Sequence, residues 1–206
     1  MHFADLDAVM AVQAACYPAS MQEPRAVVEA RLLAAAASCA VACDGDGVCG
    51  YLFAYPSRLG RVTDLGAPFA PAPQPDTLYL HDLSVAPRAH GRGLARALVE
   101  HLLAAGRKAG LLHAALVSVQ DSEGFWTGFG FRPAPTASAN ADADADADAG
   151  LASYPGAAVY MARALHPTPL QSPVTEGIPC PSKSPSSPPC MPAPARKPRS
   201  KRACAS

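Results

Sequence analysis

A histidine on a predicted strand is the residue of this sequence best suited to proton transfer. His81 lies in the apolar run Thr77–Val85, and strict alternation along a strand would place Tyr79, His81, Leu83 and Val85 on one face. An imidazole titrates near neutral pH, so it can take a proton from a nucleophile that would otherwise be protonated. The alternative is a structural histidine that is hydrogen-bonded inside a cleft.

A glycine-rich turn follows this strand and leads into a predicted helix. The turn is His90-Gly91-Arg92-Gly93, and an apolar stripe with helical spacing begins beside it. Backbone N–H groups of the turn and of the first helical turn have no partner within the helix, so they can bind an anion such as a pyrophosphate. Arg88 and Arg92 can add positive charge. The plain alternative is a tight connection with no ligand.

Two common nucleotide motifs fit this turn poorly. A P-loop requires Lys-Ser or Lys-Thr after its last glycine, and neither follows Gly93. A dinucleotide fingerprint requires a third glycine where Arg96 stands. The turn therefore predicts a phosphate site of another kind.

The segment 85–95 resembles the acetyl-CoA motif of the GCN5-related N-acetyltransferases (GNAT), commonly V-x-P-x-x-[R/Q]-G-x-G-x-[G/A]. Val85-Ala86-Pro87 sets the register, and His90 stands where Arg or Gln is usual. The segments 117–120 and 125–131 resemble the following elements of the family, so the resemblance covers roughly residues 4–165. It implies a mixed twisted sheet flanked by helices, with acetyl-CoA as co-substrate.

Within that family, Leu80-His81-x-Leu83-x-Val85 is most similar to the arylalkylamine branch, which includes serotonin N-acetyltransferase. This resemblance implies transfer of acetyl to a small primary amine by direct attack, with His81 as a base acting through ordered water. Tyr79 stands where that branch has a second histidine, and it either serves the chemistry or packs in the core. The alternatives are an acetyltransferase of protein N-termini or lysines, and a non-catalytic module that binds acyl-CoA.

The resemblance also assigns the remaining site residues. The family has a tyrosine that protonates the departing thiolate, but this chain has Trp126 there, and an indole is no acid. Water or Tyr79 would then supply the proton. Cys16, Tyr17 and Trp126 are expected at the acceptor pocket, with Cys16 as a lining residue rather than a nucleophile. The expected cofactor contacts are Leu83, Ser84, Val85, His90, Gly91, Arg92, Gly93, Leu94 and Ala95.

Sequence periodicity predicts the elements that position these residues, in the order ααββ, βαβα, ββ. This order predicts an α/β fold with a central parallel pair of strands. Gly106 and Gly110 mark the expected end of the third helix. The predicted helices are 5–16, one opened by Pro24, one from Gly93, and 122–128; the predicted strands are 38–43, 48–55, 77–85, 111–119, 129–133 and 157–165.

Composition divides the chain into an N-acetyltransferase domain, 1–165, and a tail, 166–206. The domain contains a low-complexity stretch, 134–150, which is expected to be a solvated loop. The tail is rich in Pro and Ser, has six basic residues against one acidic residue, and is expected to be disordered. Its basic cluster, 195–202, could act as a nuclear signal, but it lacks the interleaved aromatics that would indicate nucleic-acid binding.

The cysteines and the hydropathy pattern indicate a cytoplasmic protein without a metal. The seven cysteines are scattered and include no CxxC motif, so we expect reduced thiols and no zinc site. No apolar run reaches the roughly 18 residues that a membrane helix needs, and the first residues do not resemble a secretory signal.

Overall fold

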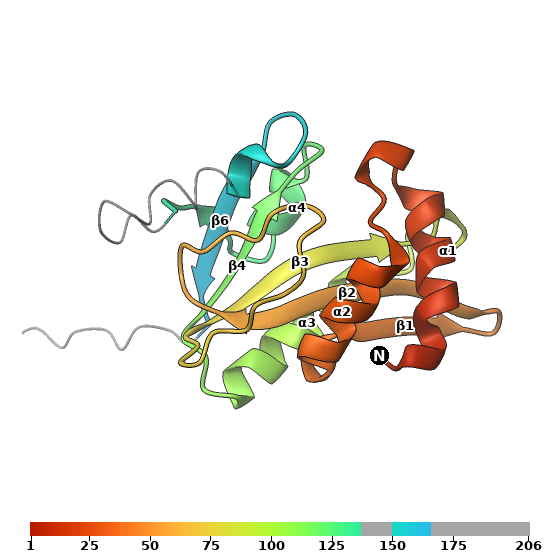
Figure 1. Ribbon diagram of the computed structural model, residues 1–206, viewed down its shortest axis with the longest axis horizontal. Helices are drawn as coiled ribbons and strands as arrows, with labels where there is room; N and C mark the ends of the chain where they lie inside the picture. Colours follow the sequence, from red (N-terminus) through yellow and green to blue (C-terminus); the bar gives the residue numbers. More distant parts are fainter. Residues whose placement is uncertain (137–149, 166–206) are drawn as a thin grey trace, which may run out of the picture. The chain divides into compact units, whose positions relative to one another are not determined.

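The computed structural model describes residues 1–136 and 150–165 of the 206-residue chain. The predicted tail and most of the predicted loop at 134–150 lie outside these ranges. Within them, the chain folds as a six-stranded mixed sheet with helices on both faces, which confirms the predicted α/β class (Figure 1).

The sheet has the strand order β1-β2-β3-β4-β6-β5. Only β3 and β4 pair in parallel, as predicted, and the other neighbours are antiparallel. The two-residue turn Gly45-Asp46 joins β1 to β2, which confirms the predicted hairpin. The strands are β1 (Ala40–Asp44), β2 (Gly47–Ser57), β3 (Thr77–Val85), β4 (His113–Ser118), β5 (Arg132–Pro133) and β6 (Val159–Ala164).

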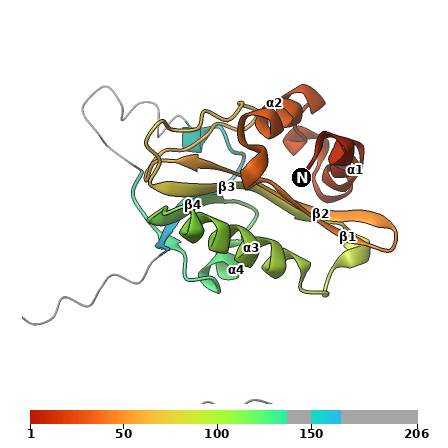
Figure 2. The same ribbon diagram turned by 90° about the horizontal axis from the view of Figure 1, so that it is seen from below.

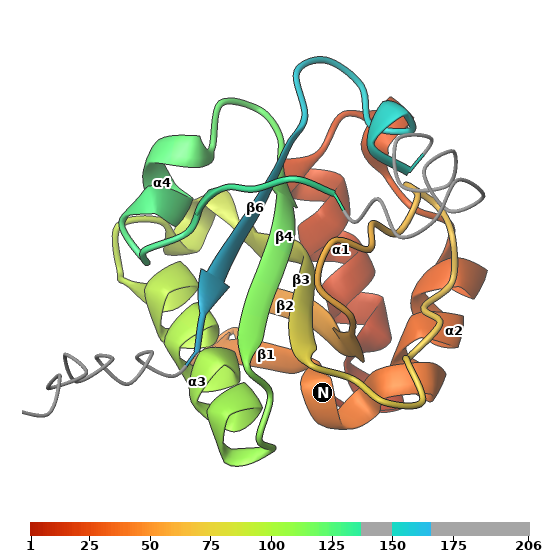
Figure 3. The same ribbon diagram turned by 90° about the vertical axis from the view of Figure 1, so that its left-hand side faces the viewer.

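The helices lie in two layers, one on each face of the sheet (Figure 2). One layer has α1 (Leu6–Cys16) and α2 (Arg25–Ala35), and the opposite layer has α3 (Leu94–Lys108) and α4 (Glu123–Thr127). Each layer covers its own hydrophobic cluster, so the sheet separates two cores. We call these the α1/α2 face and the α3/α4 face; Figure 3 shows them on opposite sides of the central strands.

The third helix runs past the glycine expected to end it. Gly106 lies inside α3, where an added Cβ would come within 3.2 Å of Leu78 and 3.1 Å of Leu165. The glycine therefore serves close packing of the helix on the sheet. Gly110, with a φ of +79°, follows the helix and permits the left-handed turn that ends it.

Strands β3 and β4 separate at one end of the sheet. They pair only from Thr77–Leu80 against His113–Leu116. Beyond that point β3 continues along β2 to Val85, while β4 continues along β6 to Ser118. The two strands diverge visibly in Figure 1. The backbone of β3 from Leu83 to Val85 therefore lies along an opening in the sheet rather than against β4.

A β-bulge in β3 corrects the predicted alternation. The register with β2 shifts by one residue between Phe53↔Asp82 and Ala54↔Leu80, which makes His81 the extra residue. Tyr79 packs in the α1/α2 cluster, but Leu83 packs against the α3/α4 cluster, so these two do not share a face. The bulge instead places His81 and Asp82, adjacent in sequence, together on the α1/α2 face, where both make their side-chain contacts.

Candidate active site

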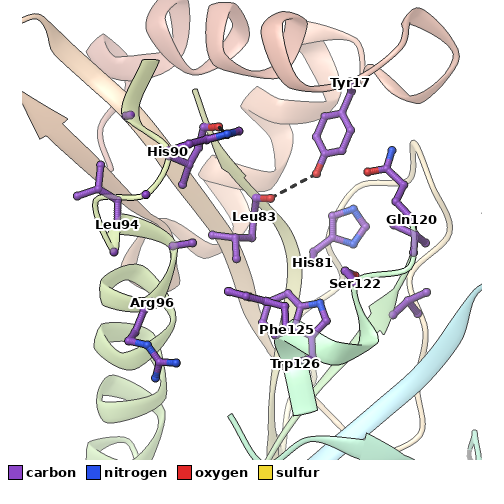
Figure 4. A pocket seen from close by; sticks show the side chains of 17 residues that line it. Tyr17, His81, Leu83, His90, Leu94, Arg96, Gln120, Ser122, Phe125 and Trp126 are labelled. Atoms are coloured by element: carbon purple, nitrogen blue, oxygen red, sulfur yellow. Dashed lines mark hydrogen bonds between the residues drawn. The ribbon is translucent and has the colours of Figure 1, made fainter. Parts of the chain in front are cut away.

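A cavity of about 440 Å³, here called the central cavity, opens where β3 and β4 separate (Figure 4). Because it lies at a gap in the sheet, its wall includes residues from both faces. Tyr17 and His81 belong to the α1/α2 side, and Leu83 and Trp126 belong to the α3/α4 side. The other lining residues are Val85, Ala89, His90, Gly91, Gly93, Leu94, Ala95, Arg96, Val117, Val119, Gln120, Ser122 and Phe125.

The glycine turn forms one end of this cavity. Gly91 and Gly93 have φ angles of +73° and +75°, a left-handed conformation that favours glycine, and a Cβ on either would face open space. Gly93 is the N-cap of α3 and supplies no capping side chain, so the first N–H groups of α3 are left for another acceptor. Leu94 and Ala95, in that first turn, line the cavity. This geometry fits a bound phosphate.

The arginines of the turn are engaged elsewhere. Arg88 and Arg92 both donate to Oδ2 of Asp44 on β1, at 2.8 Å and 2.7 Å, and Arg92 does not line the cavity. Arg96 does line it, and its guanidinium lies 4.8 Å from the centroid of the Phe129 ring. His90, predicted to contact the cofactor, lies 2.8 Å from the Val85 carbonyl oxygen through its Nε2. The cationic side chain on the wall is therefore Arg96, which sequence reasoning missed.

A second, smaller cavity of about 40 Å³, here called the side cavity, lies on the α1/α2 side of the opening. Tyr17, His81, Val117 and Val119 line both cavities, so they stand at the junction. The other lining residues of the side cavity are Met21, Glu23, Leu65, Asp82 and Tyr154, none of which is cationic.

His81 is held at this junction by a buried carboxylate. Its side chain is 2% exposed, and its Nε2 lies 3.6 Å from Oε1 of Glu23. A carboxylate can only accept, so this contact favours the proton on Nε2 and leaves a lone pair on Nδ1. Nδ1 is buried and has no hydrogen-bond partner among the described residues. Burial lowers the pKa of His81, outweighing the opposite effect of Glu23, so the imidazole is neutral at pH 7.

Glu23 is itself fixed by Arg31 and by the loop after β2. Both guanidinium NH groups of Arg31 donate to the two carboxylate oxygens of Glu23, and Arg31 also donates to the Ala67 carbonyl at 2.9 Å. The Gly66 N–H donates to Glu23 at 2.9 Å. Burial alone would raise the pKa of Glu23, but hydrogen bonds from His81 and Arg31 lower it to about 2. Glu23 therefore stays charged and orients the imidazole.

Asp82 lies between two tyrosine hydroxyl groups. Tyr17 donates to its Oδ1 and Tyr51 donates to its Oδ2, each at 2.8 Å. Burial raises the pKa of Asp82 more than these hydrogen bonds lower it. The Tyr17 hydroxyl also lies 3.4 Å from the carbonyl oxygen of Leu83, on the free edge of β3 (Figure 4).

The other predicted site residues differ in whether they line a cavity. Tyr79 is 1% exposed, lines neither cavity, and packs its ring against Tyr55 and His81. Trp126 lines the central cavity only and packs against Phe131.

Two further predicted site residues, Ser84 and Cys16, lie beside the junction of the two cavities. Ser84 is buried near Tyr17, and the Cys16 Sγ lies 3.3 Å from the Val85 carbonyl oxygen. Burial raises the pKa of Cys16, so it is a neutral thiol at pH 7.

The residues that sequence reasoning missed reach the site through long-range contacts. Glu23 and Arg31 belong to the loop before α2 and to α2, and nothing in their local sequence indicates a partner on β3. Gln120 lies on the wall with a φ of +54°, an uncommon conformation for a side-chain-bearing residue. Asp82 was visible as the neighbour of His81, but only the bulge brings the two to one side.

Residues 1–136 and 150–165 lack both a cluster suited to a metal ion and a helix suited to a membrane. They contain no cluster of three or more His, Cys, Asp or Glu that could hold a metal ion. None of their helices has the length and apolar character required to cross a membrane.

Comparison with known proteins identifies the family. The comparison with curated proteins gave no match. Among solved structures, the GphF GNAT-like decarboxylase in complex with isobutyryl-CoA is 22% identical, with a TM-score of 0.63 over 81% of this chain and 97% of that chain. The ribosomal-protein-S18-alanine N-acetyltransferase from Escherichia coli is 14% identical, with a TM-score of 0.53 over 84% and 95%. Arabidopsis thaliana Naa50 in complex with a bisubstrate analogue is also 14% identical, with a TM-score of 0.53 over 79% and 94%.

At these identities the solved structures establish the fold alone. The Acetyltransferase (GNAT) family model, however, matches residues 6–131, which is more than half of the chain. This match includes β3, the glycine turn and α4. The chain therefore belongs to the GNAT family of acetyltransferases, whose members typically bind acyl-CoA.

Proposed function

We propose that this protein transfers an acetyl group from acetyl-CoA to a small primary amine. The observation that carries the proposal is the position of His81. Its unpartnered Nδ1 is buried at the junction between a cavity that ends in a phosphate-type turn and a smaller cavity without cations.

The cofactor would lie in the central cavity. Its pyrophosphate would accept hydrogen bonds from the backbone of the turn His90–Gly93 and of Leu94 and Ala95. Its amide arm would pair with the backbone of Leu83 to Val85 in the manner of an added strand, because that edge has no partner on β4. Arg92 contributes its backbone rather than its charge, since Asp44 holds its guanidinium.

The amine would enter from the side cavity. A free amine with a pKa of ~10 is mostly protonated at pH 7, and a cavity lined by the charged carboxylate of Glu23 and by no cationic residue favours an ammonium ion. His81, neutral at this pH, takes the proton directly or through water. The amine nitrogen then attacks the thioester carbon, and the carbon–sulfur bond breaks. A side cavity of about 40 Å³ favours a small acceptor over a peptide. Assignment to the arylalkylamine branch rests on the sequence motif 80–85.

An acceptor screen tests the proposal. Release of CoA thiol is measured with acetyl-CoA and, in turn, small alkylamines, arylalkylamines, peptides with free N-termini and lysine peptides. The proposal expects release that depends on the small amines. Preference for peptides would identify a protein acetyltransferase instead. If calorimetry shows that acetyl-CoA binds but no amine causes thiol release, the protein is a non-catalytic binding module.

A further inference from the structure

The departing thiolate lacks an obvious acid in this site. Trp126 stands on the cavity wall, and its indole N–H donates a hydrogen bond but not a proton. Tyr79, the other candidate from the sequence, lines neither cavity. Among the residues that the structure describes, Tyr17 is the one tyrosine on the wall of the central cavity.

Resting on the function proposed above, we infer that Tyr17 and Asp82 form a proton relay to the leaving thiolate. Asp82 is the source of the proton, and Tyr17 carries it to the sulfur. The geometry points to this role because the Tyr17 hydroxyl is 2.8 Å from the Asp82 carboxyl and 3.4 Å from the Leu83 carbonyl. The Leu83 carbonyl lies on the free strand edge against which the arm of the cofactor would extend.

A tyrosine alone would be a poor donor here. Burial, first of all, raises the pKa of Tyr17 well above its usual value, whereas a thiol such as that of cysteine titrates near ~8.5. Transfer that left a tyrosinate would therefore be uphill. Burial also raises the pKa of Asp82, which favours the protonated form of this carboxyl. In the relay this hydrogen bond reverses: the protonated Asp82 donates to the Tyr17 oxygen, and the tyrosine hydrogen is then free for the cavity.

The step balances within the site. The amine nitrogen bonds to the carbonyl carbon, the carbon–sulfur bond breaks, and its electron pair stays on sulfur. Sulfur takes the hydroxyl proton of Tyr17 while Tyr17 takes the proton of Asp82, which is left as a carboxylate that Tyr51 also stabilises. The acceptor enters as an ammonium ion, and two of its protons are absent from the product amide. One passes through His81 and solvent to Asp82 and restores its proton, and the other leaves to solvent, so each turnover releases one proton.

The other titratable and polar groups around the relay are unchanged in every variant of the test. They are Tyr51, His81 and Glu23 around Asp82, and Cys16 and Ser84 around Tyr17.

The test is single-turnover acetyl transfer by Tyr17→Phe, Asp82→Asn and the double variant between pH 6 and 9.5. Tyr55→Phe is the matched control, because it also removes the hydroxyl of a buried tyrosine. The Tyr55 hydroxyl is hydrogen-bonded to Thr63, whereas the tyrosines hydrogen-bonded to Asp82 are Tyr17 and Tyr51. Thermal unfolding establishes that each variant is folded. We expect Tyr17→Phe to slow the step about 10²-fold at pH 6. We expect Tyr55→Phe to match the wild type.

The pH dependence separates a relay from a structural role. The relay requires the proton of Asp82, so the ratio of the wild-type rate to the Tyr17→Phe rate should fall toward one if that proton is lost at higher pH, whereas His81 and the amine titrate alike in both proteins. The double variant should be no slower than the slower single variant, because both changes interrupt one relay. A ratio that is constant with pH, or a Tyr17→Phe rate equal to wild type, would overturn the relay. Failure of wild type to release thiol with any amine would instead refute the proposed function.

Discussion

At the scale of single residues, His81 should determine how the rate responds to acid. Burial lowers its pKa below 6.5, so the imidazole is an available base above that pH and is lost as pH falls. We expect His81→Gln to reduce kcat/KM by about 10²- to 10³-fold at pH 7.5. We also expect the variant to lose the wild-type decline on the acid side.

The measurement is kcat/KM from pH 5 to 9 with an amine of low pKa, so that the acceptor itself does not titrate. His101→Gln, an exposed histidine on α3, is the control and should reproduce the wild-type profile. If kcat/KM of His81→Gln still declines at low pH, another group causes that decline.

The ion pair between Glu23 and Arg31 should stabilise the fold as well as orient His81. Their side chains are 5% and 1% exposed, so Glu23→Gln leaves a buried guanidinium without its counter-charge. We expect a loss of about 3–5 kcal/mol in the free energy of unfolding at pH 7. The folded-state pKa of Glu23 is about 2, against about 4.3 in an unfolded chain, so its contribution is complete above the unfolded value and disappears as pH falls toward 2.

Urea unfolding at pH 7 and pH 3 tests this expectation, since the difference between wild type and Glu23→Gln should shrink at the lower pH. Glu29→Gln is the control: Glu29 pairs with Arg25 on the surface of α2 and should cost less than about 1 kcal/mol. Equal losses of unfolding free energy in Glu23→Gln and Glu29→Gln would show that the buried ion pair stabilises the fold no more than the surface pair.

At the scale of elements, the turn before α3 should bind the cofactor through its backbone geometry. Gly93 has a φ of +75°, and an alanine in the left-handed region costs about 1–2 kcal/mol, so the turn should relax and move its N–H groups. We expect Gly93→Ala to weaken acetyl-CoA binding at least about tenfold, the equivalent of 1.4 kcal/mol.

Calorimetric titration with acetyl-CoA is the measurement. Gly45→Ala, in the β1–β2 turn, is the control, because a Cβ there meets nothing within 4 Å and its φ lies outside the left-handed range. Unchanged affinity in Gly93→Ala would remove the turn from the cofactor site.

The sequence predicted these elements well because their signals are local. Pro24 precedes α2, the turn Gly45-Asp46 joins β1 to β2, and the apolar run 77–85 coincides with β3. The bulge at His81 left no such signal, since it depends on the register with β2. Perfect alternation therefore assigned Leu83 to the wrong face. The partner of His81 was equally hidden, because Glu23 meets it only once α1, α2 and the sheet have packed.

At the scale of the whole molecule, the domain 1–165 should suffice for chemistry. Leu165 is buried, its N–H donates to the Leu112 carbonyl at 2.8 Å, and its carbonyl accepts from Arg107. A chain that ends after Leu165 therefore keeps every contact that β6 makes with residues 1–136 and 150–165. We expect it to retain the kcat and KM of the full chain for a small amine.

Steady-state kinetics on the two lengths checks this expectation. A chain that ends at Gly156 is the comparison and should not fold, because it lacks β6, including the buried Met161. A large fall in kcat for the chain ending at Leu165 would show that the tail contributes to the active site.

The gap between β3 and β4 has a consequence for how such a protein diverges. Under the proposed function, a cofactor held by main-chain groups at this gap and at the turn would be insensitive to most side-chain replacements, whereas an acceptor at the α1/α2 side would meet side chains such as Met21, Leu65 and Tyr154. Mutations can then accumulate on the acceptor side without loss of the donor. New acceptors can arise in this scaffold by ordinary point substitution, with the acetyl donor inherited unchanged.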